Sequence, residues 1–138
     1  WLNDTLIHVS KVDSLNDSLL ATGFPPDSAA VVQNNILQFT TLTHMCHGVR
    51  RDGAAALDLC FVACGRLDGF WEHKLAPWDM AAGSIIVTEA GGKVTDSENG
   101  PLNMDTGHIV ASNGLLHDSI IKVLVELSMK EKGLGTCD

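Results

Sequence analysis

The sequence predicts a layered α/β or α+β domain, in which helices cover a sheet. Short β-prone runs alternate along the chain with apolar segments of helical period. Glycine and proline separate these segments, and residues 115–127 form the clearest amphipathic helix. A length of 138 residues with 45% hydrophobic residues fits one globular unit, so we expect residues 1–138 to belong to a single domain.

Two strands and a helix are predicted in the first part of the chain. Residues 5–9 and 18–22 are β-prone, and the second run stops at a Gly-Phe-Pro-Pro sequence. Asp27 or Ser28 can cap a helix whose apolar residues continue at helical spacing through Phe39.

The middle of the chain alternates between strands and helices. Residues 47–51 suit a brief strand, and good helix formers occupy 53–65. Because this helix is nearly apolar, we expect it to be buried. Residues 69–73 alternate faces as a strand does, and a proline opens the helix predicted over 77–90, which a Gly-Gly pair ends. The remaining predicted elements are strands at 93–95 and 108–112 and the amphipathic helix at 115–127.

Composition argues against two classes of partner. The formal net charge is −8, the pI is near 5.0 and Arg50-Arg51 is the one basic pair, so we expect no nucleic-acid partner. The apolar runs are far shorter than the roughly 20 residues that a membrane helix needs, so we expect no membrane partner. An anionic protein that handles an anionic substrate usually relies on bound divalent cations.

The chain begins at Trp1 with neither an initiator methionine nor a signal peptide, and we expect its natural N-terminal portion to be absent. The four cysteines lack the spacing of a zinc site and the density of a disulfide scaffold. They indicate reduced thiols and a cytoplasmic location. A plastid or another organelle is the alternative, if a transit peptide was lost with the N-terminal portion.

Asp79 is the candidate ligand residue of the predicted helix 77–90. It lies in the first turn, where the helix dipole and unpaired backbone N–H groups favour anions. A phosphate or a carboxylate-held metal ion suits this position. The alternative is that Asp79 only caps a buried helix.

A second candidate is the turn at 50–56, which reads Arg-Arg-Asp-Gly-Ala-Ala-Ala. Its small residues leave backbone N–H groups uncovered, and such groups can hold a hydroxyl or phosphate oxygen. The alternative is a packing device at the start of a helix.

Specific motifs link these two candidates. Residues 71–72 are Trp-Glu, residues 77–83 are Pro-Trp-Asp-Met-Ala-Ala-Gly, and residues 86–92 end in Glu-Ala-Gly-Gly. Further segments that agree in order and spacing lie at 17–25, 50–59 and 108–113. Together they resemble the C-terminal signature of the inositol monophosphatases. The fold that this resemblance implies is the C-terminal half of an αβαβα sandwich.

The resemblance implies roles for five residues. Asp79 matches an aspartate that ligates a catalytic Mg²⁺, an ion that prefers oxygen ligands. Glu72 matches a glutamate that accepts a hydrogen bond from a substrate hydroxyl. Gly53, Ala54 and Ala55 match a turn whose backbone lies against the sugar-like ring. Many family members have Ser or Thr where this chain has Ala54, which leaves the substrate open.

The implied reaction is hydrolysis of a phosphate monoester, inositol monophosphate first of all, by a metal-activated water between clustered Mg²⁺ ions. The resemblance also implies lithium sensitivity and a homodimer that binds a small phosphorylated polyol. Histidinol phosphate, fructose 1,6-bisphosphate and a nucleotide 3′-phosphate are alternative substrates. A non-catalytic binding or scaffolding module is the alternative from another class.

The family draws most metal ligands from a Glu-Glu segment and an Asp-Pro-x-Asp-Gly-Thr motif, and this chain contains neither. The sequence Leu67-Asp68-Gly69 lacks the proline, the first aspartate and the threonine, so Asp68 is interpreted as a turn residue. We therefore expect the chain to be inactive alone. We also expect it to self-associate, because half of a layered fold leaves apolar faces uncovered.

Overall fold

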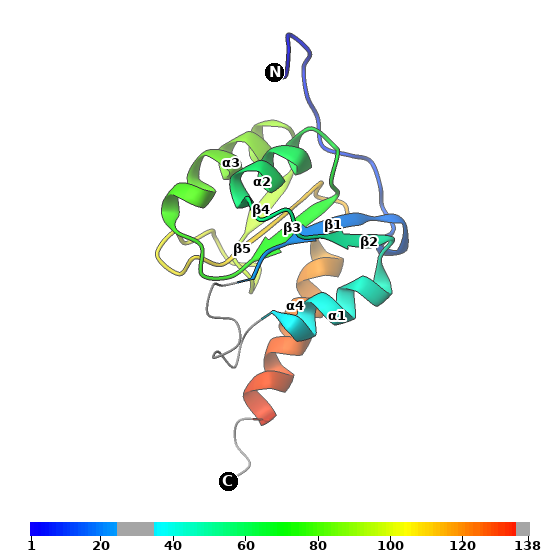
Figure 1. Ribbon diagram of the computed structural model, residues 1–138, viewed down its shortest axis with the longest axis vertical. Coiled ribbons are helices and arrows are strands. Elements are labelled where there is room, and N and C mark those ends of the chain that lie inside the picture. Colours follow the sequence, from blue (N-terminus) through cyan, green and yellow to red (C-terminus); the bar gives the residue numbers. More distant parts are fainter. Residues whose placement is uncertain (25–34, 135–138) are drawn as a thin grey trace.

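The computed structural model describes residues 1–24 and 35–134 and has three layers. A five-stranded sheet lies between a helix pair, α2 and α3, on one face and a second pair, α1 and α4, on the other (Figure 1). The N-terminal residues extend away from these layers (Figure 1). The predicted layered α/β class is therefore confirmed.

The strands are β1 (Leu19–Thr22), β2 (Gly48–Arg50), β3 (Gly69–Glu72), β4 (Lys93–Thr95) and β5 (Ile109–Ser112). The helices are α1 (Ile36–Met45), α2 (Ala55–Ala63), α3 (Pro77–Glu89) and α4 (His117–Leu134), and a 3₁₀ turn, η1, covers Leu15–Asp17.

Strand β3 is the centre of the sheet, whose order is β2-β1-β3-β5-β4. It pairs in parallel with β1 and antiparallel with β5. Phe70 points into the apolar cluster under α2 and α3, while its neighbour Trp71 points into the cluster under α1 and α4. Because side chains alternate along a strand, these two consecutive aromatic residues anchor both helix layers.

One predicted strand is wrong. The β-prone run at 5–9 forms no ladder, and an isolated bridge joins Leu2 to Thr5. Val9 donates one backbone hydrogen bond to Ala90 O (3.2 Å), and its side chain packs against the core under α3. Ile7 and Val9 of this run therefore pack against the core without strand pairing, and Leu6 is 53% exposed.

The other predicted elements are present, with shifted ends. The predicted caps Asp27 and Ser28 lie outside the described residues, and α1 is described from Ile36. The helix predicted over 53–65 begins at Ala55, and the amphipathic C-terminal helix extends beyond its predicted end. The three cysteines of the described residues are free thiols, as predicted: Cys46, Cys60 and Cys64.

Helix α2 is buried along one side only, which corrects the expectation of a fully buried helix. Leu59 and Val62 face the core, whereas the side chain of Leu57 is 56% exposed. On the neighbouring helix α3, Trp78 is 81% and Ile85 is 65% exposed. The α2–α3 layer therefore presents large apolar side chains to solvent, as the half-fold interpretation expects.

A buried polar network joins the start of α1 to strands β1 and β3. The Nδ2 of Asn35 donates to Thr22 Oγ1 and to Gly23 O, both at 2.8 Å. Its Oδ1 accepts the indole N–H of Trp71 at 2.7 Å. Asn35 has a φ of 67°, a left-handed conformation that asparagine tolerates better than most residues. One side chain therefore satisfies three buried partners.

Asp68 was interpreted as a turn residue, but its carboxylate also connects the segment before β1 to the sheet. Its Oδ2 accepts a hydrogen bond from the backbone N–H of Leu19 at 2.7 Å, and its Oδ1 accepts one from the hydroxyl of Ser10. The amide of Asn113 donates to the same hydroxyl and to Val12 O. The segment before β1 is thereby tied to the ends of β3 and β5.

We predict that Asn35→Ala lowers the free energy of unfolding by about 2–4 kcal/mol, because it leaves buried groups without partners. Urea unfolding followed by tryptophan fluorescence measures the change. Asn16→Ala is the matched control, since Asn16 is exposed and makes only a 3.4 Å contact to Asp17. Equal losses in the two variants would contradict the role of the network.

We also predict that the 138-residue chain self-associates through the α2–α3 layer. Sedimentation velocity should show a weight-average coefficient that rises with concentration. The double variant Leu57→Ser/Ile85→Ser should reduce this rise, because it removes two exposed apolar side chains. Met129→Ser, at an equally exposed apolar site on α4, should leave the rise unchanged. A parent chain that stays monomeric at all concentrations would contradict the prediction.

Candidate active site

The candidate site forms where β3 passes into α3. Glu72 is the last residue of β3, and Asp79 lies in the first turn of α3. The connection between them is fixed by Leu75, whose N–H donates to Gly107 O at 2.9 Å. A Cβ on Gly107 would overlap the backbone of Leu75, so the close approach requires glycine. Two carboxylates are thus presented at one end of the sheet.

Asp79 has a structural role that the geometry shows directly. Its Oδ2 accepts the backbone N–H of Ala76 at 3.0 Å, and its own N–H donates to Ala76 O at 3.0 Å. This reciprocal arrangement closes the first turn of α3. Within the described part of the chain, Oδ1 accepts no hydrogen bond. Asp79 therefore caps the helix with one oxygen, and its other oxygen is not engaged by any described residue.

Glu72 is half-buried and lies against the end of β1, because a Cβ on Gly23 would overlap its carboxylate. The pKa of Glu72 is raised to about 7, first by burial and then by the negative charges of Asp58 and Asp79, while Arg51 opposes the rise. At neutral pH the carboxyl group of Glu72 is therefore divided between its neutral and charged forms.

Asp58, on α2, is a site residue that our sequence analysis missed. It is only 1% exposed, and its Oδ1 has no hydrogen-bond partner among the described residues. Burial and the nearby Asp52 raise its pKa to about 6. The available signal was an aspartate in the middle of an otherwise apolar helix, since a buried carboxylate is rarely left without a role.

The Gly53-Ala54-Ala55 turn lies at the start of α2. Gly53 has a φ of 79°, which favours glycine, and a Cβ at this position would meet no atom within 4 Å. Ala54 precedes the helix, and no side chain caps it. Its carbonyl accepts the N–H of Asp58 at 3.0 Å. The turn is open, and its carbonyl contact leads to Asp58, whose negative charge acts on Glu72.

The described residues thus bring together Glu72, Asp79 and Asp58, with Arg51 as the nearby cation. Carboxylate oxygens are ligands that Mg²⁺ accepts. Among the described residues, however, no group of three or more His, Cys, Asp or Glu side chains is arranged to hold a metal ion. The three carboxylates can therefore supply oxygen ligands to a cation site, but the described residues alone do not form a complete one.

Within the described residues, none of the helices combines the length and the apolar character that a membrane-spanning helix needs.

A family model described as "Inositol monophosphatase family" matches the sequence over residues 1–129. The chain belongs to the inositol monophosphatase family. It is 51% identical over 123 residues to an inositol-1-monophosphatase of Synechocystis, covering 89% of this chain and 43% of that protein. A protein named putative Nus factor SuhB, from Neisseria meningitidis, is 43% identical over 123 residues, covering 89% of this chain and 47% of its own length.

A solved inositol monophosphatase from Anabaena (Nostoc) has the same fold. Its TM-score is 0.88 at 49% identity, and the match covers 90% of this chain and 49% of that one. The chain therefore spans about half the length of the relatives that it matches. Membership of the inositol monophosphatase family confirms the resemblance, while the role of each site residue stays a prediction.

We predict that Glu72→Gln becomes more stable relative to the parent as the pH rises from 5 to 8. The raised pKa of Glu72 means that the folded state holds its proton up to about pH 7, while the unfolded state loses it near 4.5. The parent therefore loses stability through this window. Glutamine has no proton to lose, so the variant avoids the loss.

Urea unfolding at pH 5 and pH 8 measures the free energy of unfolding of variant and parent. The difference between the two proteins removes the pH dependence that they share. Glu89→Gln, at the exposed end of α3, is the matched control and should show the same difference at pH 5 and pH 8. A Glu72→Gln effect that does not change with pH would contradict the raised pKa.

Proposed function

We propose that this chain is the substrate-binding portion of a phosphoric monoester hydrolase, with inositol monophosphate as the first-choice substrate. The observation that carries the proposal is the pairing of Glu72 with Asp79 across the β3–α3 junction, together with the coupling of Glu72 to Asp58. Family membership supports the reaction class. The geometry around Glu72 and the open turn supports a polyol substrate, and the family resemblance makes inositol monophosphate the first choice.

In this proposal Asp79 is a ligand of Mg²⁺ through Oδ1. Its Oδ2 is held by the N–H of Ala76, so the carboxylate is oriented before any ion arrives. A bound Mg²⁺ would neutralise charge on the phosphate oxygens. The clustered carboxylates repel a phosphate, just as the charges of Asp58 and Asp79 oppose a further negative charge on Glu72. A cation offsets this repulsion.

Glu72 then binds a substrate hydroxyl. At neutral pH its carboxyl group can accept a hydrogen bond when charged and donate one when neutral, so it suits an alcohol that can do either. The open backbone at Gly53, Ala54 and Ala55 provides a surface without side chains, against which a polyol ring can lie. Together they favour a phosphorylated polyol over an apolar phosphate ester.

We further propose that the whole protein acts in the cytoplasm, or in a plastid, as a lithium-sensitive homodimer. Histidinol phosphate, fructose 1,6-bisphosphate and nucleotide 3′-phosphates are the alternative substrates. A phosphatase panel with the whole protein ranks them, and poor turnover of inositol phosphates would overturn the first choice.

A non-catalytic binding role is the second candidate function. The relative from Neisseria carries the name of a Nus factor, which favours a role in an assembly for at least one family member. Under that role the carboxylates of Glu72 and Asp79 would serve only the fold, and their conservative amides would leave binding to a partner unchanged. The activity test below separates the two functions.

We predict that the 138-residue chain releases no phosphate from inositol monophosphate with Mg²⁺, because the described residues do not complete a metal site. In a longer protein that contains this segment, Asp79→Asn should lower kcat/KM by about 100-fold or more, the size expected when a group that stabilises the transition state is lost.

Asp118→Asn is the matched control, since Asp118 also lies in the first turn of a helix, α4, and is exposed. It should leave kcat/KM unchanged. Phosphate release is followed by a colorimetric assay. An active 138-residue chain, or an Asp79→Asn protein with parental activity, would contradict the proposed role.

A further inference from the structure

Two cysteines lie one helical turn apart on α2. Cys60 is part of the helix, Cys64 is the residue that ends it, and the N–H of Cys64 donates to Cys60 O at 3.0 Å. Because this hydrogen bond is that of an α-helical turn, the two Cβ atoms lie on the same face of α2, about 5–6 Å apart. The two thiols therefore form a pair within one element.

Neither thiol of this pair is used by the core. Both residues are half-buried, and neither belongs to an apolar cluster of the core, whereas Cys46 packs against the cluster under α1 and α4. Leu57, which is 56% exposed, lies three residues before Cys60 and therefore on the same side of α2. The pair is thus accessible from the outer side of the helix.

The two thiols interact with each other. The pKa of the Cys60 thiol is raised, first by burial and then by the neighbouring Cys64. The thiol of Cys64 donates to Phe61 O at 3.6 Å, so its sulfur leans back over the turn that begins near Cys60. The negative end of the α2 dipole also favours a cation at this end of the helix. Cys60 is therefore a neutral thiol at neutral pH, and it ionises when a cation replaces its proton.

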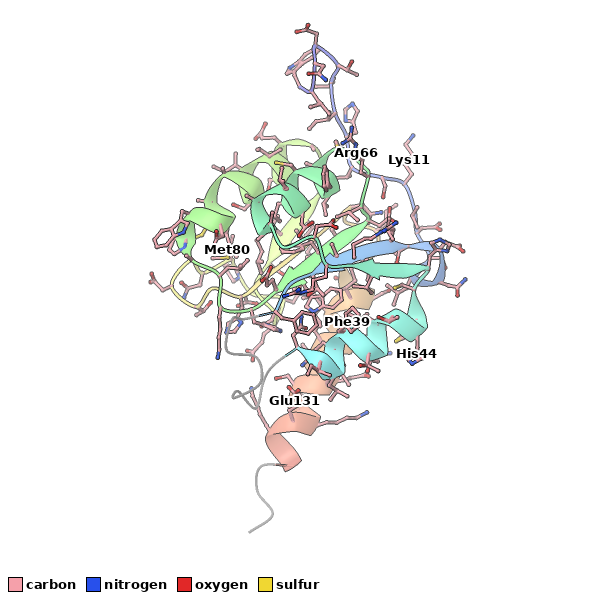
Figure 2. The ribbon with its side chains drawn as sticks, viewed as in Figure 1. Lys11, Phe39, His44, Arg66, Met80 and Glu131 are labelled. Atoms are coloured by element: carbon pink, nitrogen blue, oxygen red, sulfur yellow. The ribbon has the colours of Figure 1, made fainter. Side chains whose placement is uncertain are left out.

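A positive side chain lies at the same end of α2. The guanidinium of Arg66 lies over the ring of Phe61, 5.6 Å from its centroid, and the backbone N–H of Arg66 donates to Phe61 O at 2.9 Å. Figure 2 labels Arg66 just beyond the end of α2. Two thiolates with one monovalent cation carry a net negative charge, which the nearby guanidinium stabilises.

The type and number of ligands select the ion. Thiolate sulfur is a soft ligand that favours Cu(I), Zn²⁺ and iron–sulfur clusters. Zn²⁺ in structural sites and the clusters take four ligands, but the described residues contain no group of three or more His, Cys, Asp or Glu side chains that could hold a metal ion. Cu(I) accepts two thiolates alone. We propose that Cys60 and Cys64 form a two-coordinate Cu(I) site, in which each thiol releases a proton and each sulfur binds the ion.

Competition between the 138-residue chain and a chromophoric Cu(I) chelator tests the proposal, without oxygen and at a chain concentration below the onset of self-association. We expect one Cu(I) per chain and the release of protons on binding. Cys60→Ser and Cys64→Ser should each weaken the affinity about 100-fold or more, because the second thiolate is an intramolecular ligand at high effective concentration. Cys46→Ser/Cys137→Ser is the matched control and should retain the parental affinity.

A rescue variant tests the spacing of the two thiols. In Cys64→Ser/Ala56→Cys the second thiol lies one turn before Cys60, at an exposed position of α2, and should restore most of the lost affinity.

Four results would overturn the proposal. They are a parent chain that binds no Cu(I) or one ion per two chains, a rescue variant that binds no better than Cys64→Ser, a control double variant that loses as much affinity as Cys60→Ser, and displacement of Cu(I) by an equal concentration of Zn²⁺. Asp79→Asn should leave the Cu(I) affinity unchanged, so this proposal and the phosphatase proposal fail independently.

Discussion

The pairing of β3 on both of its edges is the constraint on which the rest of the structure depends. Gly69 begins the strand, where a Cβ would come within 2.7 Å of Ile120 and 3.1 Å of Leu20. The absence of a side chain there lets α4 approach the sheet. Phe70 and Trp71 then fill opposite faces, and Glu72 is the first residue to leave the core. The position of the candidate site is thus set by the length of one short strand.

The negative charges of the carboxylates at the candidate site destabilise the folded state. Their presence is consistent with a role in binding a ligand. A buried carboxylate oxygen that no described residue pairs, such as Oδ1 of Asp58, normally belongs to a side chain that is replaced or neutralised. Here Asp58 lies near Glu72, whose pKa the negative charges of Asp58 and Asp79 help to raise. Only Asp79 gains a compensating backbone hydrogen bond. A structural role explains Asp79 in part, but it does not explain Asp58.

The sequence predicted the layers and most elements well, because helical period and strand alternation are local signals. It failed at 5–9, where a β-prone run packs its side chains without a pairing partner, a fact that only the tertiary structure supplies. It missed Asp58, whose burial depends on the sheet beneath α2. The contact between His73 and His108 joins residues 35 positions apart and carries no sequence signal. Local patterns therefore locate site residues more readily than they reveal how those residues interact.

The exposed apolar side chains lie on α2 and α3, the two helices that carry Asp58 and Asp79, and Glu72 lies at the end of the neighbouring strand β3. Trp78 is 81% exposed and directly precedes Asp79, so a surface that covers the whole first turn of α3 would reduce the access of water to the carboxylate. Reduced solvation raises the cost of keeping Glu72, Asp58 and Asp79 charged together. A bound cation removes that cost. Covering the α2–α3 layer and binding a cation therefore favour each other, because each makes the other less costly for the same three side chains.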